Sequence, residues 1–366
     1  MTRKLLSLTL AALLAALAFA ADGDDAELEV PPKPTDEQVA AFRELCARKA
    51  KEAALARTIT APGLNDWLFL RQELRHISVG PFWGERAAEV SQATRPEYAD
   101  PTEAIVDFHE QLDELGIVLY LVPVPPKAAV YADKLDESLA GEPGPPRLDV
   151  AHEQFYELLR DKGLTVLDLF PHLWRARAQD AEDGPIYCRT DAHWSGRACV
   201  LAAERLAERI TAQDWYAGAD KGAYRTQTRK IRIDGDLRRQ MAGEKVPRER
   251  LPLRFVGVGD DMEPVLPDES APVLLLADSH GLVFHSGSDM HTRGAGLADQ
   301  LAAELGFPVD LLAVKGSAAT PARISLYRRS ASNPDYLNGK KVVIWCFAAR
   351  ELTESTGWRP LPVRKD

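Results

Sequence analysis

Two short stretches of this sequence carry side chains that can perform acyl-transfer chemistry. The first is TDAHWS, residues 190–195, which places Asp191 and His193 two positions apart. The second is ADSHG, residues 277–281, in which Ser279 follows a run of apolar residues. A serine hydroxyl is a weak nucleophile until a base removes its proton, and a third group must orient that base. We therefore predict that Asp191, His193 and Ser279 form a Ser–His–Asp catalytic group.

The local sequence supports this arrangement but also allows a simpler one. In an extended segment, side chains two positions apart point to the same side, so Asp191 can hold one ring nitrogen of His193 while the other faces Ser279. In open parallel sheets, functional groups gather at the carboxyl ends of strands, which is where the sequence places Ser279. The simpler interpretation is a structural Asp–His turn, with Ser195 as the N-cap of a following helix.

A metal site is an alternative interpretation of the same region. The segment HGLVFHSGSDMH (280–291) adds three histidines, which could join Asp191 and His193 as ligands. No H-E-x-x-H or comparable ligand spacing accompanies them, and no C-x-x-C pair occurs. We therefore rank metal binding below serine chemistry, and we expect no metal and no cofactor.

Length and charge exclude some classes of function. The chain has 366 residues and is 45% hydrophobic, which is enough for one large core or two domains. Its formal net charge of −10 disfavours nucleic acid as a partner, because the nucleic-acid backbone is itself an anion.

The N-terminus has the pattern of an export signal. Two basic residues, Arg3 and Lys4, precede an apolar stretch and an A-x-A cleavage signature, so we predict a signal peptide over residues 1–20 and a periplasmic location. An N-terminal membrane anchor is the less favoured alternative, because the apolar stretch is short for a bilayer. Loss of these two basic residues would change the net charge from −10 to −12. Residues 21–34 are acidic and proline-rich, and we expect a disordered lead there.

Four cysteines leave the disulfide pattern open. They are Cys46, Cys188, Cys199 and Cys346. In an oxidising compartment four cysteines allow three full pairings, and the spacing does not choose between them.

Helical and strand patterns alternate along most of the chain. This alternation predicts an α/β fold with a mostly parallel sheet. Residues 212–270 are polar, arginine-rich and punctuated by prolines, so we expect an irregular insertion there. The expected helices are 36–57, 101–115, 150–162, 196–210, 296–305 and one from 321; the expected strands lie within 63–74, 117–124, 164–170, 273–279, 309–316 and 341–348.

Five motifs in this order resemble the alginate O-acetyltransferase family of the AlgX/AlgJ type. The resemblance covers about residues 60–355 and implies an SGNH-hydrolase-like α/β sandwich with a mostly parallel central sheet flanked by helices. The motif order is circularly permuted, because the acid and the histidine precede the serine. We expect a single catalytic domain over residues 35–366. The motifs are NDWLFL (65–70), LVPVPPK (121–127) followed by Tyr131, YCRTDAHWSGRA (187–198), LLADSHG (275–281) and VIWCFAARELTE (343–354).

The resemblance assigns roles to individual residues. Ser279 would be the nucleophile, His193 the general base and Asp191 the residue that orients it. Gly316 would be an oxyanion donor, together with the backbone N–H of Ser279 or His280.

Other positions that match the family are candidates for substrate binding. Lys127, Tyr131 and Arg350 lie at strand ends and could line the cleft, although salt bridges and core packing explain them as well. Trp194 and Trp345, like Tyr131, could stack on a sugar or pack in the core. Departures from the family pattern put the substrate in question rather than the nucleophile; they are Ala277, His280, Cys346 and Ala348.

The resemblance implies an exported polysaccharide O-acetyltransferase that works through an acetyl-serine intermediate. The acceptor would be a polysaccharide, and a membrane-bound acyltransferase would supply the acetyl donor. The acidic net charge favours a neutral or sparsely charged glycan over alginate. Because the chain ends soon after the last expected strand, we expect a catalytic domain without a carbohydrate-binding module. Two alternatives stay open: a carbohydrate esterase with the same three residues, and a non-catalytic scaffold that binds the polymer.

Overall fold

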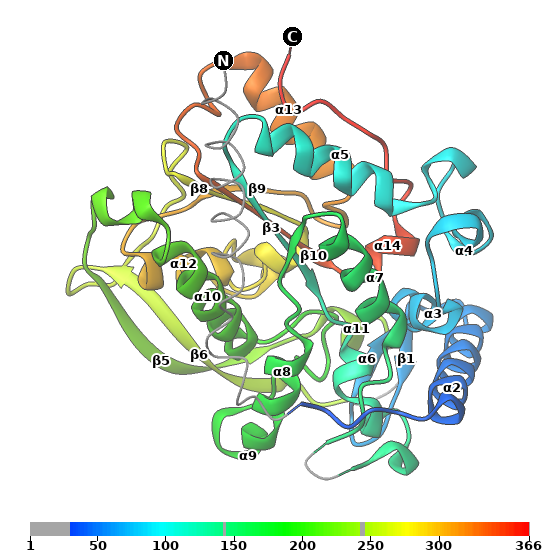
Figure 1. The fold of residues 1–366 in the computed structure, drawn as a ribbon. Helices are drawn as coiled ribbons and strands as arrows, with labels where there is room; N and C mark the ends of the chain where they lie inside the picture. The colour runs from blue at the N-terminus through cyan, green and yellow to red at the C-terminus, as the bar shows by residue number, and fades with distance from the viewer. Residues whose placement is uncertain (1–29, 142–143, 242–245, 366) are drawn as a thin grey trace. The chain divides into compact units, whose positions relative to one another are not determined.

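The computed structural model describes residues 30–141, 144–241 and 246–365 (Figure 1). The predicted signal peptide and residues 21–29 of the predicted disordered lead lie outside these residues. Residues 31–366 form one compact unit. Within the described ranges, no helix combines the length and the apolar character that a membrane span requires.

A five-stranded parallel sheet lies at the centre of this unit. Its strands run in the order β4-β3-β10-β8-β9, and all four neighbouring pairs are parallel. The predicted parallel α/β sheet is therefore confirmed. The strands are β3 (Val118–Val124), β4 (Thr165–Val166), β8 (Val273–Ala277), β9 (Asp310–Ala313) and β10 (Val342–Ala348).

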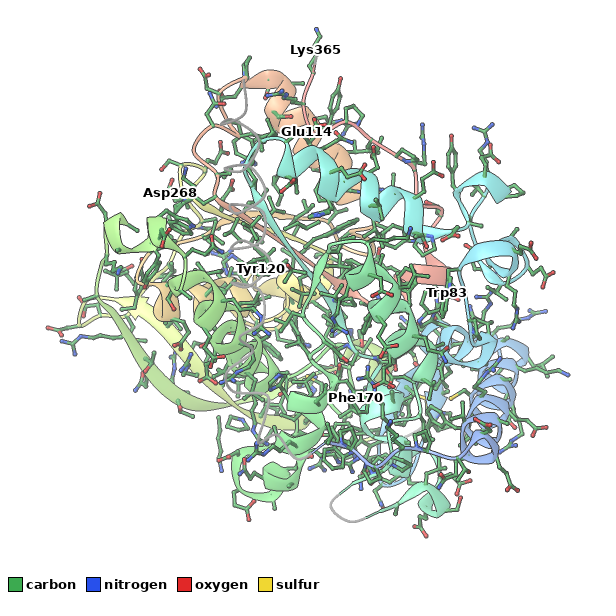
Figure 2. All side chains as sticks on the ribbon, in the orientation of Figure 1. Trp83, Glu114, Tyr120, Phe170, Asp268 and Lys365 are labelled. Carbon is green, nitrogen blue, oxygen red and sulfur yellow. The ribbon has the colours of Figure 1, made fainter. Side chains whose placement is uncertain are left out.

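Both faces of the sheet are buried, which explains why its strands are almost continuously apolar. Successive side chains of a strand point to opposite faces, so Ile344 and Trp345 of β10 belong to two separate hydrophobic clusters. Figure 2 shows Tyr120 and Phe170 among the side chains that fill the first cluster. The first cluster includes α10 (Gly196–Thr211) and α12 (Leu297–Leu305), and the second includes α5 (Pro101–Asp113), α7 (Val150–Asp161) and α13 (Pro321–Ser332).

Most predicted helices begin where capping residues indicate. Thr35 and Gln38 form a capping box at the start of α2 (Asp36–Leu55). Asp100 accepts a hydrogen bond from the Thr102 amide at 2.9 Å and begins α5. Ser195 caps α10, as the simpler interpretation of that residue predicted.

Two predicted strands are shorter than expected. The segment 63–74 contains only β2 (Leu68–Leu70), which pairs with β1 (Thr60–Pro62), and the chain then turns into α3 (Arg71–Val79). The strand expected over 164–170 is limited to β4, because Asp168 accepts from the Phe170 amide and α8 (Phe170–Ala176) begins there.

The prediction of an irregular insertion at 212–270 is wrong. These residues contain a long antiparallel pair of strands, β5 (Tyr224–Ile233) and β6 (Glu249–Val258). The short strand β7 (Glu263–Pro264) follows β6 and pairs with it to complete a three-stranded sheet. Strand β6 buries Leu251 and Leu253 in the first cluster. Strand β5 is largely exposed, and its basic, polar sequence resembles a loop because charged residues protect exposed strands.

The remaining short helices are α4 (Ala87–Val90), α6 (Lys127–Val130), α9 (Asp180–Asp183), α11 (Asp236–Arg239) and α14 (Glu351–Glu354).

Candidate active site

Ser279 lies immediately beyond the carboxyl end of β8. It begins a 3₁₀ turn, Ser279–Gly281, which the carboxylate of Asp278 caps by accepting from the His280 amide at 2.7 Å. The same carboxylate accepts from the Ala348 amide at 2.9 Å, which ties the turn to the end of β10. Gly281 is required in this turn, since a Cβ there would lie 2.5 Å from the Cβ of Ala277. The fold therefore holds the serine rigidly at the edge of the sheet where parallel strands end.

The loop that carries Asp191 and His193 is fixed by buried polar side chains from three other elements. Lys127 of α6 donates to the carbonyls of Cys188 and Asp191, at 2.9 and 2.7 Å. Glu249 of β6 accepts from the amides of Arg189 and Thr190 at 3.0 and 3.2 Å. Asp236 of α11 accepts from the Ala192 amide at 2.7 Å. These bonds satisfy the backbone of a buried loop that has no regular secondary structure of its own.

The structure brings Asp191, His193 and Ser279 together in one hydrogen-bonded chain. His193 Nδ1 lies 2.6 Å from Asp191 Oδ1, and His193 Nε2 lies 2.8 Å from Ser279 Oγ. An ionised carboxylate can only accept, so the ring proton lies on Nδ1 and Nε2 is free to accept from the serine hydroxyl. This arrangement can remove the proton from a serine as it attacks an acyl group.

The electrostatics of the site favour a basic imidazole. Burial disfavours the charged form of His193, but the neighbouring Asp191 carboxylate outweighs burial and raises the pKa of His193. Burial likewise opposes ionisation of Asp191, yet the charge of His193 and its hydrogen bond hold the Asp191 pKa well below its ordinary value. The pair therefore keeps an ionised acid beside a histidine that binds protons readily.

Asp191 has further partners that the sequence did not reveal. Its Oδ2 accepts from the backbone amide of Asp236 at 2.8 Å and from His291 Nε2 at 3.0 Å. The crowding of histidines in 280–291 was a signal for His291, but it did not say which histidine reaches the acid. Nothing in the sequence marked Asp236.

The candidate oxyanion donors differ in availability. The amide of His280 already donates to Asp278, as described above. The amide of Ser279 has no hydrogen-bond partner among the described residues, and neither has the amide of Gly316. Gly316 is exposed, with φ of +94°, in the loop after β9, the strand that neighbours β8. The Ser279 amide is thus better placed than the His280 amide to receive a developing negative charge.

A buried carboxylate holds the segment that follows Gly316. Glu351 accepts from the amides of Ala318 and Ala319, at 3.0 and 2.9 Å, and from the hydroxyl of Ser317 at 2.5 Å. Burial, reinforced by the nearby charge of Asp278, raises the pKa of Glu351 to about 8.

Two of the predicted substrate-binding residues lie beneath the site rather than on its surface. Lys127 is 1% exposed, and its ammonium group is occupied by the two loop carbonyls. Tyr131 is fully buried; its hydroxyl donates to Asp180 at 2.6 Å and accepts from the Ile186 amide at 3.0 Å. Trp194 and Trp345 are also fully buried, so none of the three aromatic rings is accessible for stacking on a sugar in this structure.

Arg350 is placed differently. It is partly exposed, and its guanidinium group forms no hydrogen bond or ion pair with any residue that the structure describes. Burial is the main cause of the lowered pKa of His280, and the charge of Arg350 adds to it; the same charge opposes the raised pKa of His193. Arg350 is therefore a cation whose charge influences His193 and His280 and which has no partner among the described residues.

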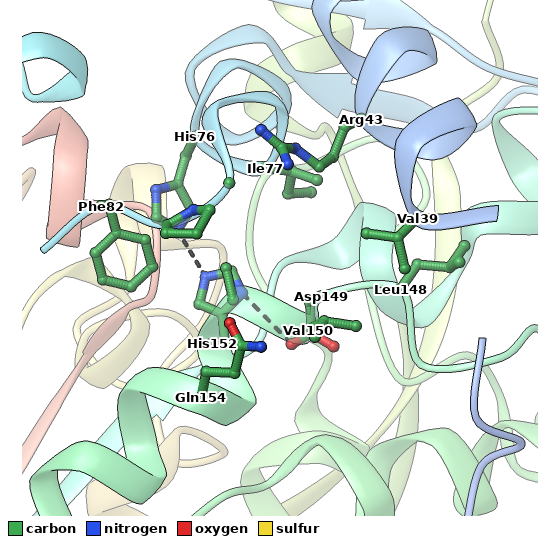
Figure 3. Close-up of a pocket in the computed structure, with 13 residues that line it drawn as sticks. Val39, Arg43, His76, Ile77, Phe82, Leu148, Asp149, Val150, His152 and Gln154 are labelled. Atoms are coloured by element: carbon green, nitrogen blue, oxygen red, sulfur yellow. Dashed lines mark hydrogen bonds and ion pairs between the residues drawn. The ribbon is translucent and has the colours of Figure 1, made fainter. Parts of the chain in front are cut away.

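The described residues line several cavities at the surface of the unit, of which two are relevant to the site. One, of about 310 Å³, adjoins the Asp191 loop and is lined by Asp66, Arg189, Thr190, Pro247, Arg248, Glu249 and Arg250. The other, of about 150 Å³, lies between α2, α3 and α7. Figure 3 shows His76 and His152 in contact on its wall. Neither cavity is lined by Asp191, His193 or Ser279.

The residues considered as metal ligands have other partners. His280 lies 3.1 Å from Asp278, and His285 lies 3.0 Å from Asp299. Asp191, His193 and Asp236 have ligand atoms within 4.8 Å of one another, but they are engaged in the hydrogen bonds given above. The four cysteines are buried free thiols.

Residues 60–349 match the family model described as SGNH hydrolase-like domain, acetyltransferase AlgX. Among curated proteins, the probable alginate O-acetylase AlgJ of Pseudomonas putida is 32% identical over 119 residues, which are 32% of this chain and 28% of that protein. The protein of the same name from Pseudomonas aeruginosa is 27% identical over 152 residues, or 41% of this chain and 32% of that protein. The matches thus span about a third of the length of these relatives.

Solved structures show the same fold. The O-acetyltransferase domain of Pseudomonas putida AlgJ superposes with a TM-score of 0.57 at 23% identity, covering 81% of this chain and 92% of that one. Pseudomonas aeruginosa AlgX gives 0.54 at 17% identity, over 80% of this chain and 66% of that one. The chain therefore belongs to the SGNH hydrolase-like domain family of acetyltransferase AlgX, as its five sequence motifs predict.

Proposed function

We propose that this protein is a polysaccharide O-acetyltransferase in which Ser279 carries the acetyl group. The observation that supports this most directly is the hydrogen-bonded chain from Asp191 through His193 to Ser279, with donor–acceptor distances of 2.6 and 2.8 Å. The names of the relatives, which specify O-acetylation of alginate, are consistent with the same reaction class.

In the first half-reaction, Ser279 Oγ attacks the carbonyl carbon of the acetyl donor while its proton passes to His193 Nε2. Asp191 stabilises the imidazolium that forms. The amides of Ser279 and Gly316 would bind the oxyanion of the tetrahedral intermediate. As that intermediate collapses, the bond to the leaving group breaks, and the leaving group takes the proton from His193. Ser279 is then an acetyl ester.

In the second half-reaction, a sugar hydroxyl takes the place of the serine hydroxyl. It loses its proton to His193 Nε2 and attacks the acetyl ester. The proton then returns to Ser279 Oγ as the ester bond breaks. The products are the acetylated sugar and free enzyme, so no water or cofactor is consumed.

The cavity beside the Asp191 loop is the proposed binding surface for the acceptor. Three of its lining residues, Arg189, Arg248 and Arg250, are basic, and Thr190 connects it directly to Asp191. Guanidinium groups bind carboxylates in a bidentate geometry, so this surface suits an acidic polysaccharide such as alginate. Asp66 and Glu249 also line the cavity, so the three arginines leave a formal excess of one positive charge there, opposite in sign to the net charge of −10, which favoured a neutral glycan.

Arg350 is the second proposed substrate contact. Its guanidinium group has no partner among the described residues and its charge influences His193, so it would be able to bind a polar group of the donor or acceptor. The periplasm is the proposed compartment, on the basis of the N-terminal sequence. The acetyl donor would come from a membrane-bound acyltransferase.

The reaction can be tested with purified protein, an acetyl ester donor and an oligosaccharide acceptor. Mass spectrometry should detect an acetyl group on Ser279 when the acceptor is omitted and acetylated oligosaccharide when it is added. Ser279→Ala should abolish both. If acetylation of the protein and of the oligosaccharide both persisted in Ser279→Ala, the proposal would be contradicted and a non-catalytic scaffold would be favoured.

A carbohydrate esterase is the rival that uses the same geometry, because water can replace the sugar hydroxyl in the second half-reaction. The same experiment separates the two activities. Release of free acetate without acetylated sugar, with donor and acceptor both present, would identify an esterase.

A further inference from the structure

A second histidine contacts the acid of the site. His291 Nε2 lies 3.0 Å from Asp191 Oδ2, on the carboxylate oxygen that does not face His193 Nδ1. The side chain of His291 is 6% exposed and that of Asp191 is 1% exposed, so water does not compete effectively for this bond.

The other partners of Asp191 define what His291 does there. An ionised carboxylate only accepts, so His291 Nε2 carries a proton and donates it. Asp191 Oδ2 therefore receives two donors, His291 and the Asp236 amide, while Oδ1 receives the amide and the ring of His193. Donors on both oxygens fix the plane of the carboxylate, and its orientation in turn fixes the imidazole.

The backbone around His291 is strained in a way that presents its ring to Asp191. His291 has φ of +74° and ψ of −67°, and Phe284 and Ser288 also have positive φ values, of 60° and 55°. Such conformations are unfavourable for a residue other than glycine and persist where surrounding contacts hold them. Here the Phe284 amide donates to the Met290 carbonyl at 2.9 Å, and the rings of Phe284 and His291 lie 5.6 Å apart.

The same segment contains a matched histidine with no connection to His193. His285 Nδ1 lies 3.0 Å from Asp299 Oδ2, and Asp299 is 1% exposed. Asp299 accepts from the Gly296 amide at 2.9 Å, at the start of α12. His285 and His291 thus form the same kind of bond to a buried acid, but only the acid of His291 belongs to the proposed catalytic group.

We propose that His291 is a positioning residue of the active site, which holds Asp191 in the orientation that makes His193 a base for Ser279. This inference rests on the proposed function. Without His291, Asp191 Oδ2 keeps only the Asp236 amide as a donor, so the carboxylate, and with it the imidazole of His193, is held less firmly in the orientation that faces Ser279.

The test measures how fast Ser279 reacts with phenylmethylsulfonyl fluoride, with intact-mass detection of the adduct. In this reaction Ser279 Oγ forms a bond to sulfur, fluoride leaves, and the serine proton passes through His193 to solvent. We expect His291→Ala to slow labelling at least about tenfold, because small errors in orientation are costly in such reactions. His291→Gln, which keeps a neutral donor, should recover most of the rate, and His285→Ala should label at nearly the wild-type rate.

A double-variant comparison separates positioning from a general structural effect. In an Asp191→Asn background, His291→Ala should cause little further loss, because the two residues act through the same bond. Equal rates for His291→Ala and His285→Ala, or an undiminished effect of His291→Ala in the Asp191→Asn background, would overturn the inference. If His291→Ala does not fold, His291→Gln and the shorter His291→Asn supply the comparison.

The outcome also distinguishes this inference from the proposed function. Absence of labelling in the wild-type protein would reject Ser279 as the nucleophile and with it the role of His291. Labelling of the wild type but not of Ser279→Ala, with unchanged rates in the His291 variants, would reject the role of His291 alone.

Discussion

His193 and His76 are buried in two different regions of this molecule, and their surroundings shift their pKa values in opposite directions. At the strand ends, His193 lies between Asp191 and Ser279, and its pKa is raised because the carboxylate outweighs burial. On the wall of the cavity in Figure 3, His76 Nε2 lies 2.7 Å from His152 Nε2, and the pKa of His76 is well below its ordinary value. Burial is the main cause there, and the neighbouring His152 adds to it.

The difference lies in the carboxylates. Asp191 is 2.6 Å from His193, whereas Asp149 is 3.5 Å from His152 and is also bound by Arg147 at 3.1 Å. Burial consequently prevails at His152, and its pKa is lowered. Contact with a carboxylate is not sufficient by itself, since burial also prevails at His280, which lies 3.1 Å from Asp278 and has a lowered pKa. The comparison supports the proposed role of His193 as a base and a structural role for the pair His76 and His152.

The largest effect is expected from the acid of the catalytic region. Asp191→Asn should reduce the rate of Ser279 acylation by roughly 10³–10⁴-fold, because an amide no longer selects the tautomer in which Nε2 accepts from the serine. The rate of labelling by a sulfonyl fluoride measures this directly. A loss of less than tenfold would indicate that Asp191 does not act through His193.

The pH dependence of acylation should report the raised pKa of His193. Only the neutral imidazole can accept the serine proton, so the rate should fall about tenfold per pH unit on the acid side, with a midpoint above about 6.5. The contribution of His193 to the free energy of unfolding should change with pH in the opposite direction. The protonated histidine stabilises the folded state at low pH, and this contribution is lost as pH rises through the raised pKa. A midpoint below 6.5 would place His193 in the same class as His76.

Variants of the cavity pair should change stability and not acylation. His152→Ala leaves the buried Nε2 of His76 without its partner, which costs about 1–3 kcal/mol of unfolding free energy. Denaturant unfolding measures the loss, and the labelling rate of the folded variant serves as the control. A labelling rate that fell as far as in Asp191→Asn would contradict the separation of the two regions.

An effect on stability alone, visible only as a dependence on pH, is expected at Glu351. Because its folded-state pKa is raised to about 8, the folded protein keeps a proton that the unfolded chain releases above about pH 4.3. The free energy of unfolding should therefore decrease as pH rises toward 8, and Glu351→Gln should reduce that slope. Thermal unfolding across this pH range is the measurement, and an identical slope in the variant would show that Glu351 is ionised in the folded state.

The strands and helices of the central sheet could be predicted because their signals are local. Thr35, Asp100 and Ser195 cap helices through bonds to amides two or three residues away, and such bonds depend on the sequence next to them. The antiparallel pair β5–β6 escaped prediction because β5 is an exposed strand. Its pairing with residues about 15 to 35 positions away is not visible in a local pattern.

In the candidate active site, too, some residues could be predicted from the sequence and the roles of others could not. The motif spacing identified Ser279, His193 and Asp191 as candidates, and the structure places them in contact. The roles of Lys127 and Tyr131 could not be predicted, because a polar residue at a strand end gives the same pattern whether it faces a ligand or a buried loop.

By itself, the sequence determined the class of fold, the order of its main elements and the three residues that form the hydrogen-bonded chain. These features follow from apolar periodicity, capping residues and motif order, all of which are recorded along the chain. The tertiary structure alone decided which groups surround Asp191, which amides are free to bind an oxyanion, and which buried histidine is basic. These properties depend on distances and burial between segments far apart in sequence, such as the 100 residues that separate Asp191 from His291.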